Sequence, residues 1–374
     1  MKRHIHFLFL LICFLPANSE SYTQIDKQSA SVPTNLKTAS EIGHYLTQNL
    51  TLPTDKVRAI YYWISHNIKY DITKLNSSKI YANPQEILDE VLQNRQGICQ
   101  HYAELFHACC KSVGIESFII SGYTDQAGEL GKLSHAWNAV LINGKFYEFD
   151  VTWAAGHLLN GKYIKEFDDK YFLITPTEYI KSHIPYDPIW QFLNNPITHK
   201  DFQKSDFSKL NIPSNFNFSD SIKLLSRLNL LERTIRENNR IKRSGITNDQ
   251  LRKQVAFNQQ IIITEKLNTS VNLFNKGIDD YNVYILNKNK QFKNTDVTEE
   301  QLLGYLSTSR QQVELAEKLL SILNPDNSDL NRQIADMQKS IIKMKSDIKN
   351  EDNFMVKYLN TWKPVRIFLF TTGK

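Results

Sequence analysis

The sequence predicts an α+β domain followed by an all-helical domain. In the first 200 residues helical patterns come before strand patterns, which favours α+β over a doubly wound fold. Near residues 200–215 the composition changes, from rich in Trp, Tyr, Gly and His to rich in Asn, Lys, Ile, Leu and Gln. A length of 374 residues, 41% of them hydrophobic and 22% charged, suits two globular domains and excludes wholesale disorder.

The first 19 residues have the pattern of an export signal. A basic start precedes the apolar stretch 7–15, and the small residues at 17–19 predict cleavage after Ser19. An anchor that is never cut, or a lipoprotein anchor at Cys13, would be the alternatives. After residue 20 no apolar run approaches the length that spans a bilayer. We therefore expect an exported protein, periplasmic or secreted, that is not membrane-spanning.

Four helices are expected after an N-terminal segment at 20–37, in a domain that covers 38–200. Their apolar residues recur at helical spacing in the segments 38–50, 55–68, 83–93 and 99–113. In the last of these, apolar residues follow Cys99 at spacings of 3, 4, 7, 11 and 14, which is one helical face. Cys109 and Cys110 are therefore expected in the core. Loss of the signal leaves three cysteines, so at least one thiol stays unpaired.

Strands follow the helices. Short apolar runs predict strands at 117–123, 136–142, 145–150 and 171–174. Asn143-Gly144 lies between two of them and predicts a two-residue hairpin loop. Residues that pair across this hairpin would have numbers that sum to 287, so Trp137 would face Asp150. His135 and Asp150 would then be diagonal neighbours on one face.

Residues 219–374 are expected to form the helical domain, joined to the first by a linker at 201–218. Helices are predicted at 219–242 and 248–275, followed by a helical hairpin over 298–360. From Leu330 to Ile348 apolar residues alternate at spacings of 4 and 3, the a/d pattern of a coiled coil. The final apolar stretch, 365–370, is expected to be a small strand or a docking segment.

Charge differs between the two parts. Residues 20–200 hold 16 Lys and Arg against 19 Asp and Glu, a net charge of −3. Residues 201–374 hold 27 against 20, a net charge of +7. A basic helical surface is usually only solvated, so no nucleic acid partner is expected. The helical domain is instead expected to bind a protein partner.

Cys99, His135 and Asp150 are the candidate catalytic residues. Cys99 begins a helix just after Gly97, where the helix dipole stabilises a thiolate and unpaired N–H groups can bind an oxyanion. On the hairpin, Asp150 can hold one nitrogen of His135 while the other nitrogen faces the thiol. Each residue alone is more often structural, but their joint arrangement favours thiol catalysis.

Other chemistries fit less well. A metal site on one helix would use Cys99, His101, His107 and Cys109. Their spacing matches no common zinc pattern, so no metal or other cofactor is expected. No G-x-S-x-G motif supports a serine nucleophile. Gln93 and Gln96 are candidate side-chain donors to the oxyanion.

Three motifs resemble the transglutaminase-like superfamily. They are GICQHYA at 97–103, SHAWNAV at 134–140 and FDVTW at 149–153. The similarity extends over about residues 38–200 and is greatest to the branch of kyphoscoliosis peptidase and cytokinesis proteins. It implies a papain-like α+β core with a Cys-His-Asp triad, matching Cys99, His135 and Asp150. His101 stands where this branch often has glycine, which crowds the turn above the thiol.

The resemblance also implies a shared chemistry, in which a thiolate attacks an amide and the acyl-enzyme passes its acyl group to water or to an amine. Neither an amine tunnel nor the calcium-binding additions of animal cross-linkers are evident in the sequence. Hydrolysis of peptide or isopeptide bonds is therefore favoured, in a protein or peptide substrate such as a cell-wall peptide. A protein-glutamine transglutaminase and a non-catalytic scaffold are the alternatives.

Overall fold

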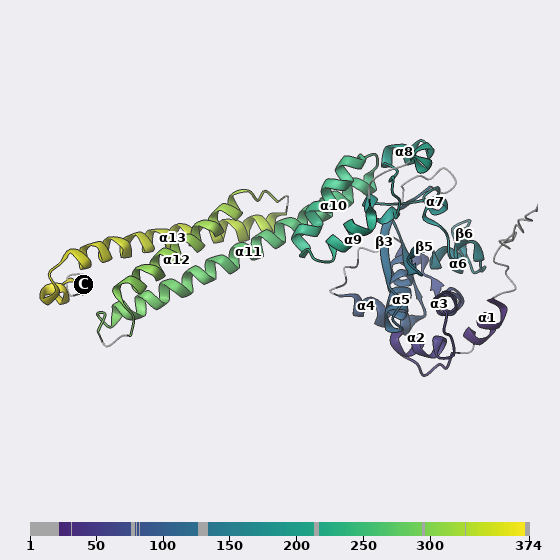
Figure 1. The fold of residues 1–374 in the computed structure, drawn as a ribbon, viewed down its shortest axis with the longest axis horizontal. Helices are drawn as coiled ribbons and strands as arrows, with labels where there is room; N and C mark the ends of the chain where they lie inside the picture. Colours follow the sequence, from purple (N-terminus) through teal and green to yellow (C-terminus); the bar gives the residue numbers. More distant parts are fainter. Residues whose placement is uncertain are drawn as a thin grey trace, which may run out of the picture. The chain divides into compact units, whose positions relative to one another are not determined.

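The computed structural model describes residues 22–30, 32–75, 79, 81, 83–125, 134–212, 217–293, 296–325 and 327–370. The expected signal at 1–19 lies outside them. The chain forms two compact units (Figure 1). The first comprises the described residues up to Ile222 together with Ile241–Leu251, and the second comprises Lys223–Arg240 and the residues from Arg252 onward.

The first unit begins with helices. These are α1 (Thr23–Ser29), α2 (Ala39–Thr47), α3 (Pro53–Asn67), α4 (Pro84–Asn94) and α5 (Cys99–Ser112). The four helices predicted from 38 to 113 are therefore confirmed to within a few residues. In the core, α5 packs on strands β3 (Ser117–Thr124) and β4 (Ser134–Ile142), and α2, α3 and α4 surround it. Its predicted buried face is observed, since Tyr102, Phe106 and Cys110 have no exposed surface.

A four-stranded antiparallel sheet completes this core. Its spatial order is β5 (Lys145–Phe149), β4, β3 and β8 (His183–Pro185). Asn138 pairs with Phe149 and Ile142 with Lys145, as the predicted hairpin requires. Asn143 and Gly144 have φ angles of 50° and 78°, the left-handed values of a type I′ turn. The predicted α+β class, with N-terminal helices packed on an antiparallel sheet, is confirmed.

The hairpin ends one residue earlier than expected. Asp150 does not pair with Trp137, because it is the N-cap of a short helix, α6 (Val151–Ala155). The strand predicted at 171–174 is also wrong. This segment begins at the end of the 3₁₀ turn η3 (Asp169–Tyr171), and within it only Ile174 forms a bridge, to Glu148.

Three strand pairings were not predicted. A small hairpin joins β6 (His157–Leu159) to β7 (Lys162–Ile164) through Asn160-Gly161, both with positive φ. This is the same Asn-Gly signal that predicted the larger hairpin. A parallel pair joins β1 (Lys69–Tyr70) to β2 (Gln96–Gly97). Finally, β8 pairs with β3, where a Cβ atom on Gly122 would lie 2.2 Å from the carbonyl oxygen of Ile184.

The second face of the sheet has its own core. Ile120, Trp137 and Ala139 of the sheet pack with Tyr179 and Phe192. The covering elements are α7 (Pro176–Tyr179), η4 (Pro188–Gln191) and α9 (Phe218–Leu225), whose Phe218 and Ile222 contact this cluster. The segment 201–218, predicted to be a linker, contains most of α8 (His199–Gln203), the 3₁₀ turn η5 (Ser208–Asn211) and the start of α9.

The chain returns to the first unit over residues 241–251. Ile241 and Leu251 are fully buried there, and Ser244 Oγ accepts a hydrogen bond from His199 N–H at 3.0 Å. Both helices that flank this return pass from one unit to the other: α10 (Leu230–Ser244) and α11 (Asp249–Asn289).

Three helices form most of the second unit. Its main core joins α11 to α12 (Glu299–Ser321) and α13 (Ser328–Asn360), with Ile334, Ile341, Met344 and Ile348 of the predicted repeat buried. The segment 365–370 is not a strand but part of the 3₁₀ helix η6 (Lys363–Phe370), whose Phe370 packs on Phe292 and Phe354. None of the described helices combines the length and the apolar content needed to cross a bilayer.

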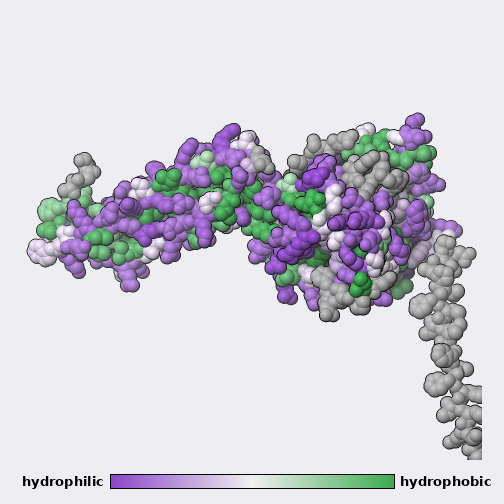
Figure 2. Space-filling model, turned by 90° about the horizontal axis from the view of Figure 1, so that it is seen from above, coloured by the Kyte–Doolittle hydropathy of each residue, from purple (hydrophilic) through white to green (hydrophobic). Residues whose placement is uncertain are grey.

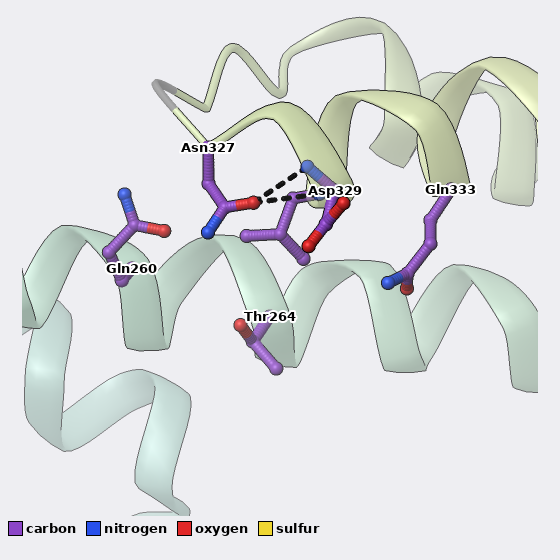
Figure 3. A pocket seen from close by; sticks show the side chains of 6 residues that line it. Gln260, Thr264, Asn327, Asp329 and Gln333 are labelled. Atoms are coloured by element: carbon purple, nitrogen blue, oxygen red, sulfur yellow. Dashed lines mark hydrogen bonds between the residues drawn. The ribbon is translucent and has the colours of Figure 1, made fainter.

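The surface of the second unit mixes apolar and polar residues (Figure 2). Well-exposed apolar side chains include Phe257, Leu286, Ile342, Val356 and Trp362. A polar hollow lies between α11 and α13 (Figure 3), lined by Gln260, Thr264, Asn327, Asp329, Leu330 and Gln333. Asn327 Oδ1 accepts the N–H groups of Asp329 and Leu330 and so caps α13.

We expect a fragment of residues 20–212 to unfold about 5–10 °C below a fragment of residues 20–251, because the shorter one loses several buried apolar side chains. Circular dichroism melts of the two fragments measure the difference. Ser244→Ala in the longer fragment serves as a control that removes one hydrogen bond and keeps the apolar burial. Equal melting temperatures would mean that residues 217–251 contribute nothing to the first unit.

Candidate active site

Cys99 is the accessible thiol of the described chain. It is the first residue of α5 and is partly exposed, whereas Cys109 and Cys110 are completely buried. Burial raises the pKa of Cys109 to about 12 and that of Cys110 well above its usual value. None of the three is in a disulfide. Only Cys99 therefore combines exposure with the positive end of a helix dipole.

The turn that carries Cys99 depends on close packing between Gly97 and His101. A Cβ atom on Gly97 would lie 2.5 Å from Cβ of His101, so only glycine fits beside this histidine. The parallel pair β1–β2 fixes Gly97, whose carbonyl oxygen accepts the N–H of Asp71 at 3.0 Å. His101 thus fills the turn, as its bulk suggested, and Gly97 provides the space.

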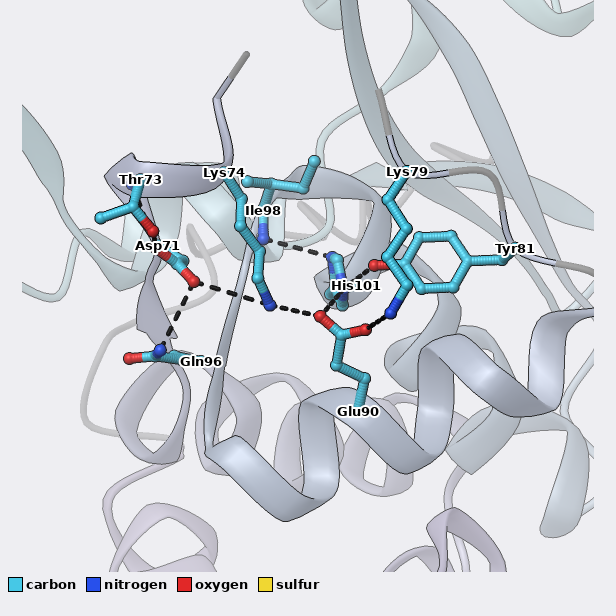
Figure 4. Close-up of polar contacts among 9 residues, drawn as sticks. All are labelled: Asp71, Thr73, Lys74, Lys79, Tyr81, Glu90, Gln96, Ile98 and His101. Carbon is cyan, nitrogen blue, oxygen red and sulfur yellow. Dashed lines mark hydrogen bonds and ion pairs between the residues drawn. The ribbon is translucent and has the colours of Figure 1, made fainter. Parts of the chain in front are cut away.

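A polar cluster holds His101 in place (Figure 4). The N–H of Ile98 donates to His101 Nδ1 at 3.3 Å, and His101 Nε2 lies 2.9 Å from the hydroxyl of Tyr81. Next to them, Glu90 of α4 binds Lys74 and Lys79, which lower its pKa to about 2. Burial lowers the pKa of His101, so the ring is neutral and can accept from Ile98. The cluster pins the first turn of α5 against α4.

His135 and Asp150 meet in a short hydrogen bond. His135 Nε2, from β4, lies 2.7 Å from Asp150 Oδ2. The other oxygen, Asp150 Oδ1, accepts the N–H groups of Thr152 and Trp153 at 3.0 and 2.9 Å. The aspartate is therefore fixed by its role as the N-cap of α6, a constraint that the strand prediction did not foresee.

The electrostatics of this pair favour charge separation. Burial lowers the pKa of His135, but the charge and hydrogen bond of Asp150 and then those of Cys99 outweigh it and raise the pKa to about 10. Burial alone would raise the pKa of Asp150, yet His135 and His183 hold it well below its usual range. Cys99 is among the groups that raise the pKa of His135, so the thiol lies within electrostatic reach of the imidazole. The structure thus brings together the three residues predicted from the sequence.

His183 is a fourth group at this site and was not among the predicted site residues. Its Nε2 lies 3.2 Å from the same oxygen, Asp150 Oδ2, and its side chain is fully buried. It begins β8, a strand of three residues that is too short to give a periodic pattern.

The predicted oxyanion donors are not engaged with the thiol. Gln93 is exposed on α4, and Gln96 donates to Asp71 Oδ2 at 3.4 Å. Neither side chain hydrogen-bonds Cys99 within the described part of the chain. Among the described residues, the backbone N–H groups of Cys99 and Gln100, at the start of α5, have no hydrogen-bond acceptor.

One group of side chains has ligand atoms close enough together to bind a single metal ion. The ligand atoms of His135, Asp150 and His183 all lie within 4.8 Å of one another. A metal here would replace the hydrogen bond between His135 and Asp150. The set Cys99, His101, His107 and Cys109 is not brought together, because His101 turns to Tyr81, His107 binds Ser117, and Cys109 is in the core.

Known proteins share this domain. Residues 40–151 match the Transglutaminase-like superfamily. Kyphoscoliosis peptidase of Mus musculus is 30% identical over 204 residues, covering 52% of this chain and 30% of that protein. Cytokinesis protein 3 of Schizosaccharomyces pombe is 24% identical over 182 residues, covering 46% of this chain and 20% of that protein. A solved structure of a TGase is similar with 16% sequence identity and a TM-score of 0.25. The match covers 43% of this chain and 38% of that chain.

The chain spans less than a third of the length of these curated relatives. The matched segment ends just past Asp150, so it takes in Cys99, His135 and Asp150 but not His183. The predicted resemblance is confirmed: residues 40–151 match the Transglutaminase-like superfamily, and kyphoscoliosis peptidase and cytokinesis protein 3 are among the proteins to which the chain is similar.

Proposed function

We propose that the first unit is a thiol hydrolase of amide bonds in proteins or peptides. The observation that carries this proposal is the grouping of Cys99, His135 and Asp150, which come from α5, β4 and the start of α6. His135 is hydrogen-bonded to Asp150 and lies within electrostatic reach of Cys99. Because His135 Nε2 binds Asp150, its Nδ1 is the nitrogen left for the thiol. Cys99 is then the nucleophile, His135 the acid and base, and Asp150 the group that orients His135.

The reaction proceeds through an acyl-enzyme. The thiolate of Cys99 attacks the amide carbon, and a C–S bond forms as the carbonyl oxygen becomes an oxyanion. His135 gives its proton to the leaving amine when the C–N bond breaks. His135 next takes a proton from water, which attacks the thioester and releases the acid and the thiol. If an amine replaced water, the same steps would give a transglutaminase, the alternative reaction.

The hydroxyl of Tyr70 is our candidate for a side-chain hydrogen-bond donor to the oxyanion. It pairs with Gly97 across β1–β2, and its ring lies 6.5 Å from that of Tyr102, one turn after Cys99. Its hydroxyl makes no hydrogen bond within the described part of the chain. Burial raises the pKa of Tyr70, and the negative charges of Cys99 and Asp150 raise it further. The phenol therefore keeps its proton within electrostatic reach of the thiol.

The setting of the enzyme is part of the proposal. The basic and apolar pattern of residues 1–19 supports export, and thus a protein or cell-wall peptide as substrate. The exposed apolar residues of the second unit support a role for its helices in binding a protein partner. If Cys99 proves unreactive, a non-catalytic scaffold becomes the better reading of both units.

Iodoacetamide should alkylate Cys99 faster than a free thiol at neutral pH, because a protonated His135 beside a thiol increases its reactivity. Mass spectrometry of timed samples measures the rate. Cys109 and Cys110 are internal controls that should stay unlabelled, and His135→Ala should slow the labelling of Cys99. Labelling no faster than that of a free thiol would support the scaffold.

Cys99→Ala should abolish activity and leave the fold intact. Asp150→Asn should reduce activity less, since its Oδ1 can still cap α6. The pKa that sets the alkaline limb of the pH–activity profile should also decrease, from about 10 toward the ordinary histidine value. The reason is that the carboxylate that raises the pKa of His135 is lost. A burst assay with p-nitrophenyl acetate measures acylation across pH. An unchanged limb would mean that another group orients His135.

Tyr70→Phe should slow the acylation burst by about 10-fold or more, as loss of an oxyanion donor does in other acyl-transfer enzymes. Tyr163→Phe is the matched control, since its ring lies 6.0 Å from that of Tyr70 but its hydroxyl donates to the carbonyl oxygen of Ala155. Equal bursts in Tyr70→Phe and the wild type would leave the oxyanion to backbone N–H groups alone.

A further inference from the structure

We propose that His183 is a positioning residue, whose neutral imidazole donates a hydrogen bond to Asp150 Oδ2 and so locks the carboxylate that orients His135. This inference rests on the proposed function, because it assigns His183 a part in the same thiol chemistry. The ring of His183 lies 5.7 Å from that of His135, but its hydrogen bond goes to Asp150, through which we expect it to act.

The hydrogen bonds of Asp150 are the first observation. Oδ2 is shared by two imidazole nitrogens, His135 Nε2 at 2.7 Å and His183 Nε2 at 3.2 Å. Oδ1 is shared by the N–H groups of Thr152 and Trp153. A carboxylate offers about four acceptor positions, so this one is saturated. With both oxygens held on two sides, the carboxylate plane cannot rotate away from His135.

The protonation of His183 follows from its partners. Asp150 Oδ2 accepts a hydrogen bond from His183 Nε2, so this nitrogen carries the proton. In a neutral ring the other nitrogen, Nδ1, must then be an acceptor. Ser182 Oγ lies 2.8 Å from Nδ1, closer than its 3.4 Å contact with the carbonyl oxygen of Tyr179, so its hydroxyl can donate to the ring. Burial lowers the pKa of His183 to about 4, against the opposing effect of Asp150.

Aromatic rings hold His183 in this orientation. Tyr179 stacks on it with ring centroids 4.2 Å apart, Trp153 lies at 4.4 Å and Trp137 at 5.3 Å. The ring has no exposed surface, so water does not compete for the Asp150 oxygen. Tyr179 and Trp153 flank the ring, whose edge is left for its two hydrogen bonds.

The backbone brings His183 to the site. His183 pairs with Thr124 in the ladder between β8 and β3, and Ile184 pairs with Tyr123. This ladder needs the small Gly122, since a Cβ atom there would meet both Ile184 O and the ring of Trp137. His183 thus enters from the opposite edge of the sheet to β5, and Asp150 is gripped by groups from three separate elements.

The test compares variants at 183 and 182 in the full chain. His183→Gln keeps an N–H donor near the position of Nε2, whereas His183→Met fills the space without a donor. Ser182→Ala removes the hydroxyl that faces Nδ1. We expect the alkylation rate of Cys99 by iodoacetamide to fall about 10-fold in His183→Met, to stay within about 2-fold in His183→Gln, and to fall by an intermediate factor in Ser182→Ala. Thermal melts check that each variant is folded.

A double-mutant cycle separates positioning from a general structural role. If His183 acts only through Asp150, adding His183→Met to Asp150→Asn should not slow alkylation beyond Asp150→Asn alone. The inference would be overturned if the factors by which the two single variants slow alkylation multiplied in the double variant. It would also be overturned by a His183→Met variant that is folded and reacts as fast as the wild type, provided that wild-type Cys99 is itself reactive.

Nitrogen-15 NMR of labelled histidine keeps the inference testable if Cys99 is unreactive, an outcome that would count against the proposed function alone. We expect His183 to be protonated at Nε2 only, from pH 5 to 8. We also expect the protonation of the His135 ring nitrogens to change in His183→Met but not in His183→Gln, beyond the small shift that loss of the ring 5.7 Å away causes in both. A charged His183, or a ring protonated at Nδ1 in this range, would overturn the inference whatever the reactivity of the thiol.

Discussion

The first unit is organised around a buried negative charge. Asp150 has no exposed surface, and an ion without water must be compensated by nearby donors. Two backbone N–H groups of α6 and two imidazoles supply that compensation. Each donor comes with its own structural demand: a helix must begin at 151, β4 must present His135, and β8 must lie at the edge of the sheet. The carboxylate therefore specifies the local fold as much as it prepares the chemistry.

The position of Cys99 depends on close packing of its neighbours, whereas that of His135 depends on the charge of Asp150. Cys99 begins the helix at the centre of the first core, and the turn before it is compressed between Gly97 and His101. Here the polar cluster around Glu90 acts as a clamp at the rim of the core. The thiol is thus held by a helix and the imidazole by a sheet. Under the proposed function, small displacements of either group would be costly to catalysis.

Much of this architecture could be predicted from the sequence, because its signals are local. Helical spacing found α5, and Asn143-Gly144 fixed the register that leads to His135. The misses also have a common cause. The strand β8 and the helix α6 are held by tertiary contacts and are too short for periodicity to reveal. His183 was missed for that reason, since its partner Asp150 lies 33 residues away in the sequence.

The division of the chain at 241–251 has a consequence for biosynthesis. The ribosome completes the candidate catalytic residues by position 150, yet the segment that brings Ile241 and Leu251 into the first unit is made about 100 residues later. In the interval the nascent chain exposes part of its apolar surface, at a stage when it has also produced the basic segment 223–240. The core of the first unit can therefore close only after residue 251 has been made, or, if the chain is exported as proposed, only after that residue has crossed the membrane.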